Sequence, residues 1–87
     1  MEFQKEPGRI FAMEGDKLLA EVTFPVESGV AVIDHTFVDG SLRGQGVASQ
    51  LLEAATAQIR AAGRKARPVC SYAQRWFAEH PESADLL

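Results

Sequence analysis

The sequence has one cysteine among its 87 residues, so no disulfide can form within a single chain. It has no apolar run near the roughly 18 to 20 residues that cross a bilayer, and no apolar signal-peptide core near its start. We therefore expect a reducing, cytoplasmic location and no membrane partner.

A basic excess is absent too, because nine Lys and Arg residues stand against twelve Asp and Glu residues, a net charge of −3. A general nucleic-acid binder normally carries a basic excess, so we expect no nucleic-acid partner. The histidines, the cysteine and the carboxylates show no metal-ligand spacing, which predicts that no metal is bound. Repeats and linkers are also lacking, and the length is near the lower limit for a self-sufficient core, so residues 1–87 are interpreted as one domain.

The features that are present begin with β-strand patterns. Residues Met1–Pro7 are polar, and we expect them to be frayed. Glu14-Gly15-Asp16 supplies a hairpin turn between the first two strands, and Pro25–Gly29 turns the chain into the third. The β-branched and aromatic residues predict strands over Arg9–Met13, Lys17–Phe24 and Val30–Val38.

Helical patterns dominate the second half. A helix is predicted from about Gly44 to Ala62, with Gly63 as its C-terminal cap. Its apolar face, at three- and four-residue spacing, consists of Ala48, Leu51, Leu52, Ala55, Ile59 and Ala62. A fourth strand is expected at about Ala66–Cys70. Ser71 then opens a last helix, in which Ser71-x-x-Gln74 has capping-box form, and Pro81 ends it.

This order of elements predicts an α/β fold with a mixed β-sheet. Three antiparallel strands come first, and the third and fourth strands flank the long helix. A strand–helix–strand unit of this kind makes its two strands parallel through a right-handed crossover. A C-terminal helix completes the domain.

The segment Arg43-Gly44-Gln45-Gly46-Val47-Ala48 lies between the third strand and the long helix. The first N–H groups of a helix have no intrahelical partner, and the helix dipole adds about half a positive charge there. Glycine lets an anion approach the backbone closely. The segment therefore predicts a phosphate or pyrophosphate site, although it matches neither the P-loop nor the dinucleotide-binding pattern.

The spacing Arg43-x-x-Gly46-x-Ala48 resembles the signature loop of the GNAT superfamily, the acyl-CoA-dependent N-acetyltransferases. The likeness spans roughly residues 8 to 82, and it is strongest to a subgroup of very small GNAT-like proteins. Beyond the loop it is carried by His35-Thr36-x-Val38, Pro68-Val69-Cys70-Ser71-Tyr72, Trp76 and His80-Pro81.

The resemblance implies a minimal GNAT-like fold whose third and fourth strands splay apart and hold the acyl-pantetheine arm between them. It implies an N-acetyltransferase that uses acetyl-CoA as co-substrate and acetylates an amine the sequence does not identify. A CoA- or acyl-CoA-binding module without turnover, and a protein-interaction domain on this fold, are the alternatives. The cofactor-binding residues that it implies are Phe37, Val38, Arg43, Gly44, Gln45, Gly46, Val47, Ala48 and Ser49.

Three residues are catalytic candidates: His35, Cys70 and Tyr72. An imidazole suits a general base near neutral pH, but a strand histidine can equally be held by Asp34 or Thr36. Cys70 is an acyl-accepting nucleophile, an acid for the leaving thiolate, or a small buried residue. Tyr72 lies where many GNAT enzymes carry a tyrosine acid, and packing at the helix start is its alternative role.

GNAT domains are typically longer and carry helices between their first two strands that help form the acceptor site. The turn Glu14-Gly15-Asp16 leaves no room for such helices. We therefore expect either an acceptor, small molecule or protein, that docks on an open groove, or a homodimer in which the partner completes the site.

Overall fold

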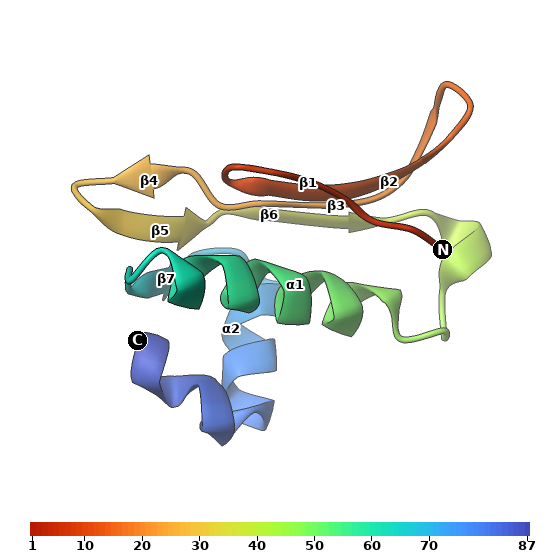
Figure 1. The fold of residues 1–87 in the computed structure, drawn as a ribbon. Helices are drawn as coiled ribbons and strands as arrows, with labels where there is room; N and C mark the ends of the chain where they lie inside the picture. Colours follow the sequence, from red (N-terminus) through yellow and green to blue (C-terminus); the bar gives the residue numbers. More distant parts are fainter.

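The computed structural model describes residues 1–87 as two β-sheets that lie on one side of the helices (Figure 1). The four-stranded sheet has the order β1 (Gln4–Glu6), β2 (Arg9–Glu14), β3 (Lys17–Thr23) and β6 (His35–Val38). The three-stranded sheet has the order β4 (Val26–Glu27), β5 (Val30–Ile33) and β7 (Ala66–Pro68). The helices are α1 (Val47–Ala61), α2 (Ser71–Glu79) and the short 3-10 helices η1 (Gly40–Leu42) and η2 (Pro81–Leu86).

The predicted first two strands are confirmed as β2 and β3, an antiparallel hairpin. The expected fraying of Met1–Pro7 is wrong, because β1 pairs antiparallel with β2. Gly8 has φ +77°, which lets the chain reverse between these two strands. The side chain of Gln58 on α1 holds the turn, since its Oε1 accepts from Gly8 N at 2.9 Å and its Nε2 donates to Glu6 O at 3.1 Å.

The third predicted strand, Val30–Val38, is divided at Asp34 into two strands that belong to different sheets. β5 pairs with β7 in parallel, which confirms the parallel arrangement expected around α1. β6 pairs antiparallel with β3. At the break, Asp34 N donates to Thr23 O at 3.2 Å, and Ile33 O accepts from Val69 N and Cys70 N at 2.9 and 3.2 Å. The sequence did not predict this break, because β-branched and aromatic residues lie on both sides of Asp34.

The segment Pro25–Gly29, expected to be a turn alone, contains the short strand β4, which pairs antiparallel with β5. Ser28 and Gly29 have φ values of +52° and +81°, the left-handed pair that a two-residue hairpin of type I′ requires.

Helix α1 begins at Val47, three residues later than predicted. Gly44 and Gly46 have φ values of +80° and +72°, and this left-handed conformation cannot continue an α-helix. Of the predicted face, Ala48 is only partly buried and Ala62 is exposed, because they lie at the two ends of the helix. The buried residues of α1 are Val47, Leu51, Leu52, Ala55, Thr56 and Ile59.

The start of helix α2 also differs from expectation. Strand β7 stops at Pro68, and Cys70 is the N-cap of α2, with its Sγ accepting from Ala73 N at 3.4 Å. The predicted capping box at Ser71 does not form. The Gln74 side chain donates instead to the carbonyls of Pro68 and Val69, both at 3.4 Å.

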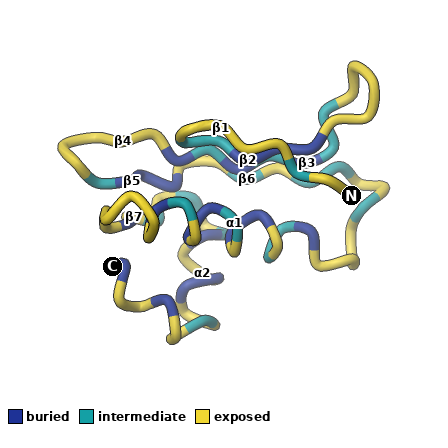
Figure 2. Tube along the Cα trace, in the orientation of Figure 1, coloured by how far each residue is buried: buried dark blue, intermediate teal, exposed yellow.

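The core lies between the sheets and the helices, where Figure 2 shows the buried stretches of β2, β3, β5 and α1 turned toward each other. Ile10, Val22 and Ile33 on the strands and Leu51 and Leu52 on α1 are fully buried there. No element covers the opposite face of the four-stranded sheet, here called the outer face (Figure 1). Neither helix combines the length and apolar character that a membrane span requires.

Replacing Gln58 by alanine removes both of its bonds to the β1–β2 turn and leaves the half-buried Gly8 N–H without a partner. We expect the free energy of unfolding, measured by urea denaturation, to fall by about 1–3 kcal/mol. Gln50, exposed on α1 and without a side-chain hydrogen bond, is the matched control, and Gln50→Ala should change stability by less than about 0.5 kcal/mol. Equal losses in the two variants would show that Gln58 does not hold β1.

Candidate functional site

The loop that leads into α1 is held at its start by Asp39. The Asp39 carboxylate caps η1, where its Oδ2 accepts from Ser41 N at 3.1 Å and Ser41 Oγ at 2.6 Å. These bonds, with a smaller contribution from Lys17 Nζ at 3.7 Å, lower the pKa of Asp39 below its ordinary value. The carboxylate therefore stays charged and keeps its cap at neutral pH.

The N-terminus of α1 has no side-chain cap. Gly46 is the N-cap residue, and its carbonyl accepts the first helical bond, from Gln50 N at 3.1 Å. The N–H groups of Val47, Ala48 and Ser49 precede that bond and have no intrahelical partner. The first turn carries no acidic residue, so the positive end of the helix dipole is not neutralised. An anion is the ligand that such a terminus favours.

Two hollows adjoin this terminus, and we call them together the β6 groove. The first, about 210 Å³, is lined by Val38, Leu42, Arg43, Gly44, Gly46, Val47, Ala48, Ser49 and Tyr72. The second, about 240 Å³, is lined by Thr36, Phe37, Val38, Ala48 and Tyr72. Because Val38, Ala48 and Tyr72 line both, the groove extends from the glycine loop along β6. Gln45 does not line it, and its Nε2 lies 3.5 Å from Ser41 O.

One edge of β6 has no strand beside it, because β6 is the last strand of its sheet. Asp39 N donates to Leu19 O at 2.8 Å, and hydrogen-bonded pairs alternate along an antiparallel ladder. The Phe37 amide, two residues back and opposite Glu21, therefore points at β3. The Val38 amide points toward the open edge and the groove. Phe37 and Val38, both predicted to bind the cofactor, both line the groove, but only Val38 directs its amide toward it.

Cys70 and Tyr72 lie at the start of α2, beside the far end of the groove. Cys70 is half-buried, and its Sγ lies 3.7 Å from Thr36 Oγ1. Burial raises the pKa of the Tyr72 hydroxyl, and the negative charge of Glu79 raises it further. Tyr72 is therefore protonated at neutral pH and can donate a proton into the groove that it lines.

The His35 side chain points away from the groove. Successive strand residues point to opposite faces, so His35 lies on the outer face while Thr36 points toward Cys70. Its Nε2 is 3.5 Å from Glu21 Oε1, and Glu21 Oε2 also receives Arg9 Nε at 2.6 Å. His35 is thus held by Glu21, not by Asp34 or Thr36, and it does not line the groove.

Sequence reasoning missed three residues of this site. Thr36 and Leu42 line the groove, and Trp76 donates from Nε1 to Ser49 Oγ at 3.0 Å. Trp76 also stacks on His80, with ring centroids 4.0 Å apart, and its bond to Ser49 connects α2 to the first turn of α1. Period-two alternation from Val38 could have placed Thr36 on the groove side. No sequence pattern pairs Ser49 with a tryptophan 27 positions later.

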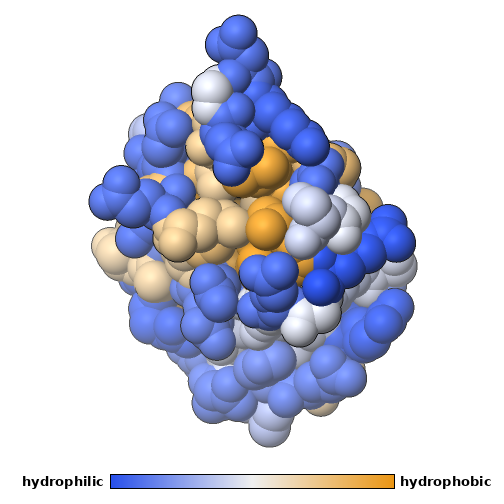
Figure 3. Space-filling view, turned by 90° about the vertical axis from the view of Figure 1, so that its right-hand side faces the viewer, coloured by the Kyte–Doolittle hydropathy of each residue, from blue (hydrophilic) through white to orange (hydrophobic).

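A third hollow, about 580 Å³, lies at the same end of the molecule. It is lined by the apolar residues Met1, Met13, Leu19 and Leu42, with Glu2, Gln4 and Glu14 beside them. Figure 3 views this end, with an apolar area surrounded by hydrophilic side chains. Leu42 lines both this hollow and the β6 groove, so the two sites are neighbours. No group of three His, Cys, Asp or Glu side chains is arranged to hold a metal ion.

Residues 9–86 match the family model of the GCN5-related N-acetyltransferases. The chain belongs to this family. It resembles the NMR structure of a GCN5-like protein from Staphylococcus aureus, at 29% identity and a TM-score of 0.79, over 98% of this chain and 85% of that one. These findings confirm the resemblance to the GNAT superfamily and the mixed α/β fold. No match was found among curated proteins.

A second GNAT structure shares the fold at lower similarity. It is AAC(6')-Iy in complex with the bisubstrate analog CoA-S-monomethyl-acetylneamine, with a TM-score of 0.55 and 22% identity. The match covers 82% of the present chain but 58% of the AAC(6')-Iy chain, so the present chain is the shorter of the two. Family membership supports acetyl transfer in general, while the roles of individual groove residues stay predictions.

Replacing Ser49 by alanine leaves the indole N–H of Trp76, a residue 3% exposed, without its partner. We expect a loss of about 1–3 kcal/mol in the free energy of unfolding and a change in the fluorescence of this single tryptophan. Ser71, exposed at the start of α2 and without a side-chain bond, is the control, and Ser71→Ala should leave both unchanged. If Ser49→Ala changes neither the free energy of unfolding nor the fluorescence, the bond between Trp76 and Ser49 does not connect the two helices.

Proposed function

We propose that this protein is an acetyl-CoA-dependent N-acetyltransferase that transfers an acetyl group to an amine. The observation that carries the proposal is the β6 groove, which joins the uncapped N-terminus of α1 to Tyr72 and Thr36 along an unpaired strand edge. Membership of the GCN5-related N-acetyltransferase family supports this chemistry. The CoA-containing analog bound by AAC(6')-Iy supports CoA as the acyl carrier.

The residues of the groove fit the parts of CoA. The amides of Val47, Ala48 and Ser49 would bind the pyrophosphate at the helix terminus. Arg43 lines the same hollow and forms no salt bridge within the protein, so its guanidinium is available to a phosphate. The open edge of β6 would receive the pantetheine arm, whose amide groups can pair with a strand edge.

Acetyl transfer forms a bond from the amine nitrogen to the carbonyl carbon and breaks the bond from that carbon to sulfur. The amine loses a proton and the leaving thiolate gains one. The Val38 N–H is positioned to stabilise negative charge on the carbonyl oxygen. Tyr72, with its raised pKa, would supply the proton to the thiolate. Cys70 is assigned either the same proton-donor role or that of an acyl-accepting nucleophile.

His35 would serve as general base from the outer face. Its contact with Glu21, whose side chain is 15% exposed, orients the imidazole. An amine that approaches over the outer face reaches His35 before it reaches the groove. The outer face is open because β2 and β3 are joined by a turn at Gly15 and Asp16 and not by helices. A protein amine, or a small amine enclosed by a homodimer partner, fits this openness.

The same openness favours a second candidate, a CoA-binding module without turnover. No element of the chain encloses the acceptor side, whereas the cofactor side is built from the loop, α1, β6 and α2 (Figure 1). The module and the enzyme share one binding site and differ only in whether an acetylated product forms.

Calorimetric titration of the reduced protein with acetyl-CoA and with CoA tests the binding site. We expect saturable, micromolar binding of both. Gly46→Leu would fill the space before the α1 terminus and weaken binding at least about tenfold, a loss of about 1.4 kcal/mol. Gly15→Leu is the matched control, because Gly15 has a similar φ of +59° in open space on the distant β2–β3 turn. Equal affinity in the Gly46 and Gly15 variants would place CoA elsewhere.

An acceptor screen with peptides and polyamines then tests turnover. Tyr72→Phe should lower kcat at least about a hundredfold if Tyr72 is the acid. Because Tyr72 acts when protonated and its pKa is raised, activity should persist through the pH range in which an ordinary tyrosine loses its proton. Full activity of Cys70→Ala would exclude an acyl-cysteine. Binding without product for any acceptor would favour the non-catalytic module.

A further inference from the structure

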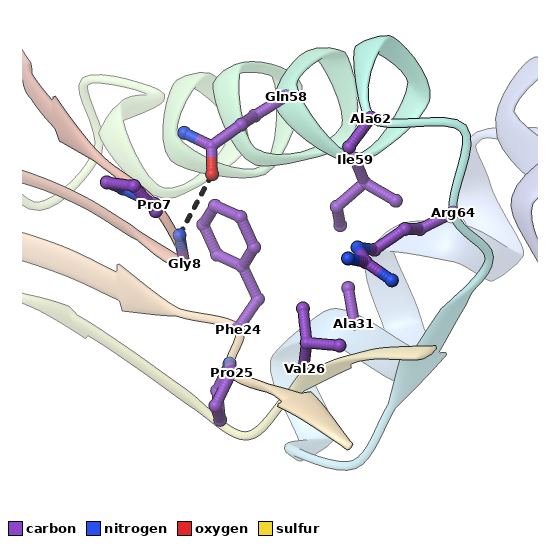
Figure 4. A pocket seen from close by; sticks show the side chains of 10 residues that line it. All are labelled: Pro7, Gly8, Phe24, Pro25, Val26, Ala31, Gln58, Ile59, Ala62 and Arg64. Carbon is purple, nitrogen blue, oxygen red and sulfur yellow. Dashed lines mark hydrogen bonds between the residues drawn. The ribbon is translucent and has the colours of Figure 1, made fainter. Parts of the chain in front are cut away.

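A separate cavity of about 320 Å³ lies at the opposite end of α1 from the glycine loop. Its walls are the apolar residues Phe24, Pro25, Val26, Ala31, Ile59 and Ala62. They come from the end of β3, the β4–β5 hairpin and the last turn of α1, as Figure 4 shows. Val47 and Ile59 lie about 18 Å apart along the helix at 1.5 Å per residue, so this cavity is distinct from the β6 groove.

Arg64 is the single charged residue that lines the cavity. Figure 4 shows its guanidinium pointing into the space between Ile59 and Ala31. One of its nitrogens, Nη1, donates to Gly29 O at 3.2 Å, and no carboxylate of the protein contacts the side chain. Arg9 and Arg60, by contrast, are bound by Glu21 and Asp85 at 2.6 and 3.0 Å. Four of the five N–H donors of Arg64 are therefore available to a ligand.

The other polar side chain in the wall, Gln58, is held by the β1–β2 turn. Gln58 uses its oxygen for Gly8 N and its nitrogen for Glu6 O, as the dashed bond in Figure 4 shows for the first of these. A ligand in the cavity thus meets apolar walls and one cation. A carboxylate is the group whose geometry matches a guanidinium through two parallel hydrogen bonds.

We propose that this cavity binds a small apolar monocarboxylate, with its hydrocarbon part between Ile59 and Val26 and its carboxylate on Arg64. The volume is about twice the roughly 150 Å³ of an apolar cavity that holds benzene, so an aromatic ring with a short chain fits. Cavities of this size, mostly apolar and with one placed polar group, are typical small-molecule sites. The site goes beyond acetyl transfer and does not depend on it.

The test is an NMR titration of the ¹⁵N-labelled full chain with 4-phenylbutyrate and with its uncharged isostere, 4-phenylbutyramide. We expect saturable, submillimolar binding of the acid, with the largest shifts at the amides of Gly8, Ala31, Ala62 and Gly63. The amide analogue should bind roughly ten- to hundredfold more weakly, because it lacks the charge-assisted bonds to Arg64. Equal binding of both probes, absence of saturable shifts, or shifts confined to the β6 groove would each overturn the proposal.

Variants test the residue assignment. Arg64→Met keeps an unbranched side chain without the charge and should weaken the acid roughly ten- to hundredfold while leaving the amide analogue unchanged. Ala62→Leu, at an exposed wall position, should weaken both probes by filling the cavity. Arg67→Met is the control, since Arg67 is exposed on β7, forms no salt bridge and lines no cavity. Undiminished binding of the acid to Arg64→Met, in a protein with unchanged urea midpoint, would contradict the assignment.

Acetyl-CoA provides an independent check. Because the two sites lie at opposite ends of α1, saturating acetyl-CoA should not displace 4-phenylbutyrate, and the acid should bind even if the protein binds no CoA. Competition between the two ligands would show that the acid occupies the β6 groove and would overturn the proposal.

Discussion

The break at Asp34 is the structural constraint on which the rest of the site depends. A continuous strand from Val30 to Val38 would lie in one sheet, so it could not pair with β7 in one sheet and with β3 in the other. Instead, the Ile33 carbonyl accepts two N–H groups from the end of β7, and Asp34 turns to bond with Thr23 on β3. The three-stranded sheet therefore continues from β5 to β7, and the four-stranded sheet ends at β6. The free edge of β6 is the direct result.

Two helix N-termini lie beside the groove that this free edge creates. α1 begins beside the glycine loop without a side-chain cap, whereas α2 is capped by the sulfur of Cys70. Both termini add positive potential, which suits the negative groups of the ligand that we propose, a pyrophosphate at one end and a leaving thiolate at the other. The bond from Trp76 to Ser49 connects the two helices. The cofactor recognition that we propose would therefore depend on backbone groups more than on charged side chains.

The two faces of the four-stranded sheet differ in how well this short chain covers them. The α1 side is filled by buried residues of the core and ends in the groove. The outer face carries the Arg9–Glu21–His35 contacts and has no covering element. At the C-terminal end of α1, Arg64 lines a separate cavity. A chain of 87 residues can thus form the β6 groove, our proposed cofactor site, while the outer face, the proposed acceptor side, stays open.

The sequence alone determined most of the local elements, the position of the glycine loop and the family, because strand alternation, helical spacing and glycine position are properties of short segments. It correctly predicted β2, β3 and the parallel pairing around α1. It missed β1, since backbone pairing and the distant Gln58 hold that strand and its own residues are polar and exposed. Only the tertiary structure decided the break at Asp34, the orientation of the Phe37 amide and the face on which His35 lies. These depend on which strand pairs with which, and hydrogen bonds between distant segments set that choice.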